Sequence, residues 1–161
     1  MTDAFNQENM ASKNIHRQIL LRLKEAESIL DIGCGEGHLV NYLARQTGRK
    51  VVGLDISANG FARAKKGGAR AGIHQLVECY QGDACHMPCF GDAQFAAVTL
   101  LYTLHHIEDA PMALREIKRV LQVRGLVLIG DWVVEEDVSR GRCFRLTVRE
   151  IVDWLKEAGL E

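Results

Sequence analysis

The stretch SILDIGCGEG, residues 28–37, decides the fold, because a short apolar run leads directly into three alternating glycines. The apolar run predicts a buried strand, and the glycines predict a loop whose backbone can approach a ligand closely. The helix expected at 38–46 presents free backbone N–H groups in its first turn. The third glycine of a dinucleotide-binding loop would fall on His38. The spacing therefore argues against nicotinamide or flavin, and a tight turn without a ligand is the alternative.

On both sides of this stretch, apolar runs alternate with helical patterns. Strands are predicted at 28–32, 50–55, 76–81, 95–101 and 125–132. Helices are predicted at 10–25, 38–46, 57–71 and 109–121, and between Thr147 and Gly159, where Thr147 and Glu150 form a capping box. Near-continuous apolar strands joined by helices are typical of a parallel sheet covered on both faces. The predicted fold class is therefore α/β, a three-layer, doubly wound, Rossmann-like parallel sheet.

The composition restricts the classes of function. For a chain of 161 residues we predict a flexible N-terminal arm at 1–9, followed by one domain at 10–161. A net charge of −1 argues against a nucleic-acid-binding surface, and no apolar run is long enough to cross a membrane. The five cysteines are an odd number and no secretory signal precedes them, so we expect reduced thiols and a cytoplasmic protein.

Polar residues follow three more predicted strands, at the edge where ligands of parallel sheets bind. Asp55 ends the second strand, where a carboxylate can accept hydrogen bonds from both hydroxyls of a ribose, although helix capping is an alternative. Asp83 follows the third strand and can accept a hydrogen bond from the amine of a base, or form a simple turn. His105 and His106 follow the fourth strand, where they can act as bases, form a wall of the cleft or bind a metal. Adjacent residues on a helix point roughly 100° apart, which argues against shared metal binding.

Five segments in this order resemble the class I S-adenosylmethionine-dependent methyltransferases, in their small-molecule branch: ILDIGCGEGHL, VVGLDIS, QGDACHMP, FAAVTLLYTLHHIEDA and VLQVRGLVLIGDW. The resemblance covers about residues 28–160 and implies S-adenosylmethionine as the methyl donor. It implies that Asp31 holds the amino end of the donor, that Asp55 binds the ribose, and that Ile56 lies beside the adenine. The other donor-binding residues that it implies are Gly33, Cys34, Gly35, Gly37, Asp83, Ala84 and Leu101.

The C-terminal part departs from the family pattern. Members of this family usually continue into two more strands that form an antiparallel hairpin, whereas this chain stops at Glu161, where the sixth strand would begin. We therefore expect a five-stranded sheet that lacks the hairpin. Natural proteins rarely leave a strand edge bare, so we expect a homodimer contact or a partner protein to cover it.

The predicted function is transfer of a methyl group from S-adenosylmethionine to a small-molecule acceptor, without a metal. The sulfonium of the donor is already activated, so the protein mainly has to align acceptor and methyl group. Tyr102, His105 and His106 are the candidate bases. Cys85, His86 and Cys89 resemble part of a zinc site, but no second ligand pair completes it. Two alternatives stay open: a non-catalytic S-adenosylmethionine-binding module serving a partner, and a nicotinamide-dependent oxidoreductase, against which the glycine spacing argues.

Overall fold

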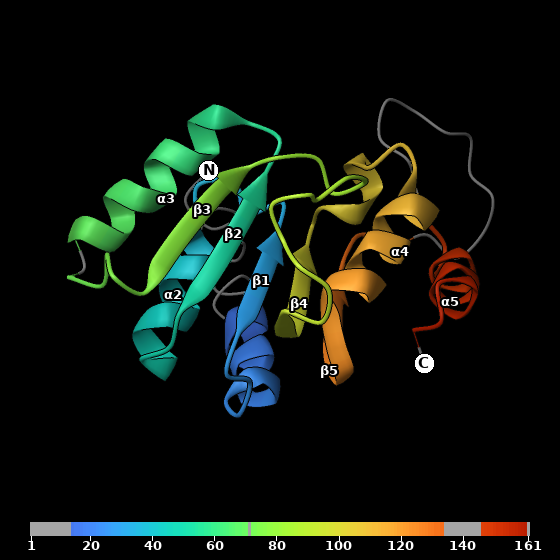
Figure 1. Ribbon diagram of the computed structural model, residues 1–161, viewed down its shortest axis with the longest axis horizontal. Coiled ribbons are helices and arrows are strands. Elements are labelled where there is room, and N and C mark those ends of the chain that lie inside the picture. The colour runs from blue at the N-terminus through green and yellow to red at the C-terminus, as the bar shows by residue number, and fades with distance from the viewer. Residues whose placement is uncertain (1–13, 71, 134–145, 161) are drawn as a thin grey trace, which may run out of the picture.

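The sheet has five parallel strands in the part of the chain that the structure describes. This structure is a computed structural model, and it describes residues 14–70, 72–133 and 146–160. The strands are β1 (Ile29–Ile32), β2 (Val51–Asp55), β3 (Val77–Gln81), β4 (Phe95–Leu101) and β5 (Leu121–Gly130). Their order is β3-β2-β1-β4-β5 and every pairing is parallel (Figure 1). The predicted fold class is confirmed, whereas the predicted arm at 1–9 lies outside the described residues.

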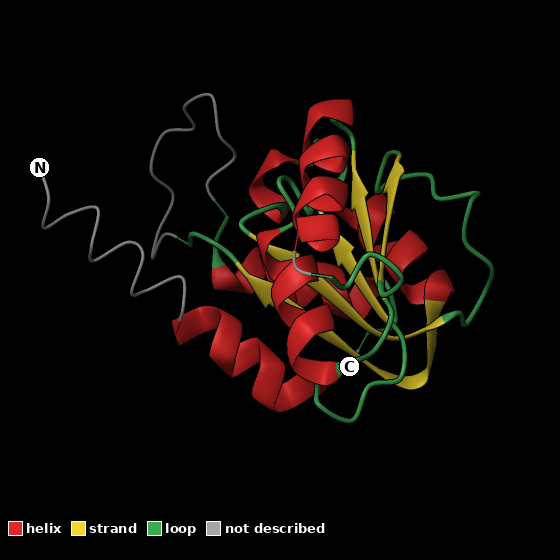
Figure 2. Ribbon diagram, turned by 90° about the vertical axis from the view of Figure 1, so that its left-hand side faces the viewer, coloured by secondary structure: helices red, strands yellow, loops and turns green. Residues whose placement is uncertain are grey.

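Helices cover both faces of this sheet and complete three layers (Figure 2). One face carries a helix at 14–23, together with α2 (His38–Thr47) and α3 (Ala58–Arg70). The other face carries α4 (Ala110–Val120) and α5 (Val148–Glu157). Successive side chains of a strand point to opposite faces, so each strand contributes to two hydrophobic cores. In β1, Ile29 joins the core under α2, whereas Leu30 joins the core under α4.

The strand order places a topological switch point between β1 and β4. The chain leaves β1 through α2 and pairs β2 on one side of β1, and it later returns to pair β4 on the other side. The connections therefore diverge at the carboxyl ends of β1 and β4, and ligands of open parallel sheets bind in the crevice that results. The fold alone thus predicts a ligand site at the carboxyl ends of β1 and β4.

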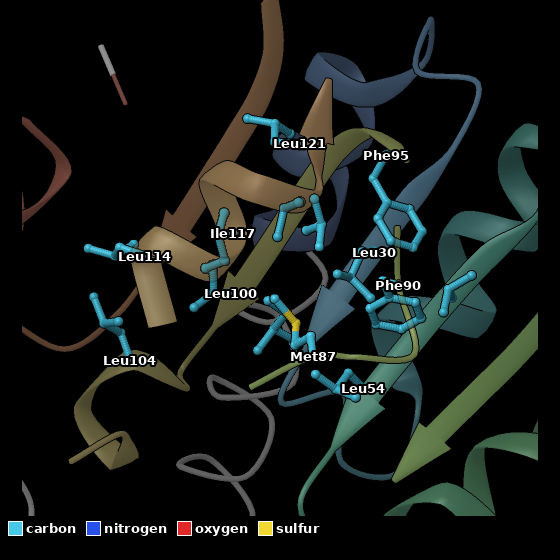
Figure 3. Packing of buried hydrophobic residues seen from close by; sticks show 14 of the residues in the cluster. Leu30, Leu54, Met87, Phe90, Phe95, Leu100, Leu104, Leu114, Ile117 and Leu121 are labelled. Atoms are coloured by element: carbon cyan, nitrogen blue, oxygen red, sulfur yellow. The ribbon is translucent and has the colours of Figure 1, made fainter. Parts of the chain in front are cut away.

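The segment 82–94 joins β3 to β4 and covers part of the sheet without forming a helix. Its Met87 and Phe90 are buried against the core beneath α4, where Phe90 meets Phe95 edge to face at a centroid distance of 5.1 Å (Figure 3). Two residues of α4 fix the segment from the other side. Glu116 accepts a hydrogen bond from the backbone N–H of Met87 at 2.8 Å, and Arg119 donates to the carbonyl oxygens of Met87 and Phe90 at 2.9 Å each. The loop is therefore anchored at both its apolar and its polar groups.

Most predicted helix boundaries agree with the structure. The capping box of Thr147 and Glu150 is present, and the backbone N–H groups of Gly159 and Leu160 close α5 on the carbonyls of Lys156 and Leu155. Asp109 caps α4, with its side chain accepting a hydrogen bond from the N–H of Met112.

The predicted bounds of the fifth strand were wrong at both ends. β5 begins at Leu121, directly after α4, and ends at Gly130, before Asp131 and Trp132. Its first residues pair irregularly with β4, because Phe95 pairs with Leu121 but Ala97 pairs with Leu126, so that four residues of β5 lie opposite one residue of β4. Residues 122–124 are exposed, and Arg124 has a φ of 65°, so hydrophobic patterning gave no sign of the pairing there.

β5 forms one edge of the sheet in the described part of the chain, where it pairs with β4 alone. A shallow groove of about 400 Å³ runs between β5 and α5. It is lined mainly by apolar side chains, which include Val127, Ile129, Val148, Val152 and Leu155. None of the helices described here is long and apolar enough to cross a membrane.

Candidate functional site

A cavity of about 780 Å³ lies at the carboxyl ends of the strands, at the switch point. This volume is in the range of small-molecule and cofactor sites. Seven residues that the sequence singled out line it, namely Gly33, Asp55, Ile56, Asp83, Ala84, Tyr102 and His106. The tertiary structure adds several residues to which sequence reasoning gave no role in donor or acceptor binding, among them Cys85, Thr103, Ile107, Glu108 and Asp109. Segments that are up to about seventy residues apart in the chain thus meet at one opening, as expected for a doubly wound sheet.

The glycine loop has a backbone that other residues adopt only with strain. Gly33, Gly35 and Gly37 all have positive φ angles, of 70°, 48° and 76°. At Gly33 there is also no space, because a Cβ atom would lie 2.3 Å from the side chain of Thr103. At Gly35 nothing lies within 4 Å of such an atom. The first glycine therefore permits close packing within the protein, whereas the second leaves space above the loop.

The Asp55 carboxylate is held by backbone groups on both sides. Its Oδ2 accepts a hydrogen bond from the N–H of Gly35 at 2.7 Å, and its Oδ1 accepts one from the N–H of Ser57 at 2.8 Å. These bonds join the glycine loop to the end of β2 and fix the direction of the carboxylate. Each oxygen keeps a further lone pair, which can accept from a ligand hydroxyl. The next residue, Ile56, is 74% exposed and offers an apolar surface at the cavity wall.

Asp83 and its neighbours form the far wall of the cavity. Asp83 Oδ1 accepts a hydrogen bond from the backbone N–H of Cys85 at 2.8 Å, which closes a turn and orients the carboxylate. The Cys85 thiol donates to the carbonyl oxygen of Asp109 at 3.5 Å. Burial and the nearby carboxylate of Asp83 raise the pKa of this thiol to about 11. Cys85 is therefore protonated near neutral pH and is not an activated nucleophile.

Five residues that the resemblance implied for donor binding do not line the cavity, namely Asp31, Cys34, Gly35, Gly37 and Leu101. Asp31 points to the opposite face of β1, where it is 3% exposed and accepts a hydrogen bond from the Thr99 hydroxyl at 2.6 Å. Burial raises the pKa of Asp31 to about 7. Cys34 is buried against Gly53, and hydrogen bonding to Cys79 raises the pKa of the Cys34 thiol.

The backbone carbonyl of Leu101 accepts a hydrogen bond from the Thr103 hydroxyl at 3.0 Å. The strand alternation explains the placement of Asp31, since its neighbour Ile32 faces the cavity and successive side chains cannot share a face. The structure thus places these groups beneath or beside the cavity, close to residues that line it.

The turn after β4 presents Tyr102 and His106 to the cavity and directs His105 elsewhere. Tyr102 has a φ of 54°, an unusual value for a residue with a side chain, and its N–H donates to the carbonyl oxygen of Gly130 at 2.7 Å. Its ring stacks on Trp132, with a centroid distance of 5.2 Å and an angle of 23° between the planes. His105 Nδ1 instead lies 2.5 Å from Oδ1 of Asp131.

Sequence reasoning missed Asp131, because the predicted strand at 125–132 placed it inside the strand. With the true end at Gly130, Asp131 becomes a polar residue at a strand end, like Asp55 and Asp83. Among the residues that the structure describes, no group of three or more His, Cys, Asp or Glu side chains is arranged to hold a metal ion.

Comparison with known proteins places this geometry in a family. The methyltransferase domain family matches residues 30–129, which include the glycine loop, Asp55, Asp83 and both histidines. The chain belongs to the class I S-adenosylmethionine-dependent methyltransferases. The resemblance noted in the sequence is therefore confirmed at the level of the family.

Individual relatives fit the same family. The chain is 39% identical over 114 residues to a 2-phytyl-1,4-naphtoquinone methyltransferase of Thermosynechococcus vestitus, covering 70% of this chain and 49% of the relative. It is 30% identical over 155 residues to a 27-O-demethylrifamycin SV methyltransferase of Amycolatopsis mediterranei, covering 88% of this chain and 57% of the relative. Among solved structures, the [4+2]-cyclase SpnF superposes with a TM-score of 0.86 at 25% identity, covering 92% of this chain and 58% of that one. The chain spans about half the length of the curated relatives that it matches.

Proposed function

We propose that this chain binds S-adenosylmethionine in the cavity at the switch point and transfers its methyl group to a small-molecule acceptor. The proposal rests mainly on the Asp55 carboxylate, which accepts a hydrogen bond from the N–H of Gly35 and lines a cavity of about 780 Å³. A carboxylate that can accept hydrogen bonds from two hydroxyls, next to a loop of alternating glycines, suits the ribose of a nucleoside. The family and the named relatives supply the donor and the type of reaction.

The residues present fit an adenosyl donor. Asp55 would hold the ribose hydroxyls, and the exposed Ile56 would cover one face of the adenine ring. Asp83 would accept a hydrogen bond from the exocyclic amine, with Ala84 leaving space beside the ring. The open space above Gly35 would take the part of the donor that passes over the loop. S-adenosylmethionine supplies an activated methyl group on a sulfonium sulfur. The protein has to bind the donor and the acceptor, orient them, and exclude water.

Asp31 contributes through its charge rather than by lining the cavity. Burial is the main cause of its pKa of about 7, and the nearby Asp55 raises this pKa further. A donor that carries an ammonium and a sulfonium group would stabilise the ionised form of Asp31. Donor binding below about pH 7 would therefore release a proton from this carboxyl, and donor affinity would rise with pH through that range.

The acceptor would bind on the side of the cavity formed by β4 and β5. Tyr102 and His106 line this side, and Trp132, which is 69% exposed, stacks on Tyr102. Aromatic side chains give a large apolar contact area at low entropic cost, which suits an acceptor with a planar ring. One relative is named for a naphthoquinone, and such a ring would fit this surface. His106 would contact the acceptor, as the base if the acceptor loses a proton and as a wall if it does not.

A non-catalytic S-adenosylmethionine-binding module is not favoured, because the similar curated proteins are named methyltransferases. The structural similarity to a cyclase indicates that the fold hosts other chemistry as well, so fold alone does not specify the reaction.

The first experiment measures donor binding by calorimetry with S-adenosylmethionine and S-adenosylhomocysteine. We expect dissociation constants in the micromolar range, about −7 to −9 kcal/mol. The second measures S-adenosylhomocysteine formation with a panel of hydroxylated aromatic and macrocyclic acceptors. Binding without product for any acceptor would favour the binding-module alternative, and absence of binding would contradict the whole proposal.

We further propose that the protein acts in the cytoplasm and that a second copy covers the edge at β5. Cys34, Cys85 and Cys89 are free thiols, as expected in a reducing compartment. At the edge, Leu126, Val148 and Val152 are exposed apolar residues beside a strand that pairs with β4 alone in the described part of the chain. Sedimentation of the purified protein over a wide concentration range tests this, because a strictly monomeric species would contradict self-association.

A further inference from the structure

Two buried cysteine side chains meet beneath the glycine loop. Cys34 lies in the loop, between Gly33 and Gly35, and Cys79 lies in the middle of β3. Cys34 is 7% exposed and Cys79 is 5% exposed, and both belong to the core beneath α2. The pair therefore joins the loop to a strand that is two positions away in the sheet.

The contact between the two cysteines depends on a glycine in β2. A Cβ atom at Gly53 would lie 2.7 Å from Sγ of Cys34, so this thiol fills the space that the missing side chain leaves. Gly53 pairs with Cys79 in the parallel register of β2 and β3, and paired residues direct their side chains to the same face of a sheet. The Cys79 side chain therefore stands beside that space, where it forms a hydrogen bond with the Cys34 thiol.

The hydrogen bond between the thiols determines which of them ionises first. This bond, together with burial, raises the pKa of the Cys34 thiol, which therefore keeps its proton and donates to the sulfur of Cys79. Cys79 is then the first of the two to lose its proton, and the thiolate is the form that attacks an oxidant. Because both residues are buried, only a small neutral oxidant such as a peroxide suits this reaction.

The position of Cys34 connects the pair to the proposed donor site. Its backbone N–H donates to the carbonyl oxygen of Leu54 at 3.1 Å, and the N–H of the next residue, Gly35, donates to Oδ2 of Asp55 at 2.7 Å. A disulfide bond is shorter than a hydrogen-bonded contact between two thiols, so its formation draws the loop toward β3. This movement shifts the N–H of Gly35 and so changes the direction of the Asp55 carboxylate.

We propose that Cys34 and Cys79 form a reversible disulfide that lowers the affinity of the cavity for S-adenosylmethionine when a peroxide is present. The effect on binding rests on the proposed function, whereas formation of the bond does not. First, the Cys79 sulfur attacks one oxygen of hydrogen peroxide and the oxygen–oxygen bond breaks, which gives a sulfenic acid and one water. The Cys34 sulfur then attacks the sulfenic sulfur, so that the sulfur–sulfur bond forms, the sulfur–oxygen bond breaks and a second water leaves with the thiol proton. Both sulfurs are oxidised and the peroxide is reduced.

The test treats the full chain with hydrogen peroxide and identifies linked peptides by mass spectrometry. We expect a bond between Cys34 and Cys79, and a dissociation constant for S-adenosylhomocysteine that rises at least about tenfold in calorimetry, within the usual range for coupling between two sites. Dithiothreitol should reverse both changes. Cys79→Ala should bind S-adenosylhomocysteine equally well before and after peroxide treatment. Cys89→Ala, which removes an exposed thiol outside the pair, is the matched control and should respond like wild type.

Equilibration with oxidised and reduced dithiothreitol gives a second measurement. Coupling between two sites is reciprocal, so S-adenosylhomocysteine should favour reduction of the disulfide by the same factor by which the disulfide weakens binding. If Cys79→Ala does not fold, Cys34→Ala replaces it in the peptide analysis and should leave Cys79 without a disulfide.

Three results would overturn the inference. One is the absence of a bond between Cys34 and Cys79 in wild type, and another is a bond that leaves the affinity for S-adenosylhomocysteine unchanged. The third is an equal loss of affinity in peroxide-treated Cys79→Ala, which would point to oxidation of Cys85 in the cavity. Failure of reduced wild type to bind S-adenosylhomocysteine would instead contradict the proposed function, and the peptide analysis would still decide whether the bond forms.

Discussion

The two sides of the cavity are built differently. On the donor side, the glycine loop, Asp55 and the segment 82–94 are joined by backbone hydrogen bonds and anchored on the core beneath α4. On the acceptor side, Tyr102 and Trp132 are exposed and β5 forms an edge of the sheet. A site that binds one constant donor can be rigid, whereas specificity for different acceptors is better placed on exposed and variable elements. Changes on the donor side should therefore affect folding and donor binding together, and changes on the acceptor side should leave both intact.

The largest effect is expected at Gly33. Gly33→Ala places a Cβ atom 2.3 Å from Thr103 at a φ of 70°, so we expect a loss of about 3–5 kcal/mol in the free energy of unfolding. Gly35→Ala is the matched control, because it has a positive φ of 48° but nothing within 4 Å of its Cβ. It should lose only about 1–2 kcal/mol. Urea denaturation measures both, and equal losses would show that the contact with Thr103 is not decisive.

The second effect concerns Asp31 and pH. The folded pKa of about 7 lies above the ordinary value, so the stability that this carboxyl contributes is present below about pH 4 and is lost as pH rises through about 7. Asp31→Asn does not titrate, and the amide oxygen can still accept from Thr99. Relative to wild type, the variant should therefore gain about 2–4 kcal/mol between pH 4 and pH 8. Denaturation at several pH values, with Asp153→Asn as control, measures this difference, and parallel pH profiles for the two proteins would contradict the buried-carboxyl explanation.

The third effect separates the two donor-side carboxylates. Asp55→Ala should weaken donor binding by at least about 2 kcal/mol, because two ribose hydroxyls lose a charged acceptor. Asp83→Ala should cost less, since it removes one contact to a neutral amine. Calorimetry with S-adenosylhomocysteine gives both numbers. Equal affinities of wild type and Asp55→Ala would show that the ribose is bound elsewhere.

The smallest effects are expected on the acceptor side. Trp132→Ala removes an exposed ring, so we expect a change of less than about 0.5 kcal/mol in stability and no change in donor affinity. Its KM for an aromatic acceptor should rise, because the stack with Tyr102 is lost. The side chain of Leu126 on β5 is exposed, so Leu126→Lys should likewise preserve the fold while weakening self-association. A large loss of stability in either variant would remove the distinction between the two sides.

Much of the site could be predicted because its residues follow strands along the chain. Local patterns indicated the ends of β1, β2, β3 and β4, and so pointed to Gly33, Asp55, Asp83 and His106, which line the cavity. The same reasoning failed at β5, where an exposed and irregularly paired stretch hid the start of the strand, and where the predicted end lay past Asp131. Thr103 carried no signal either, because its importance lies in its contact with Gly33, seventy residues away in the chain.

The sequence by itself determined the succession of strands and helices and the loops that carry polar residues, because hydrophobic periodicity, glycine spacing and capping are local properties. Only the tertiary structure decided which of these residues share a space. The order of the strands brings the ends of β1, β2, β3 and β4 to one cavity, and the alternation of side chains along β1 turns Asp31 away from it. The bond between His105 and Asp131 likewise exists because β4 and β5 are neighbours in the sheet. Such contacts depend on packing between distant segments, which no local pattern encodes.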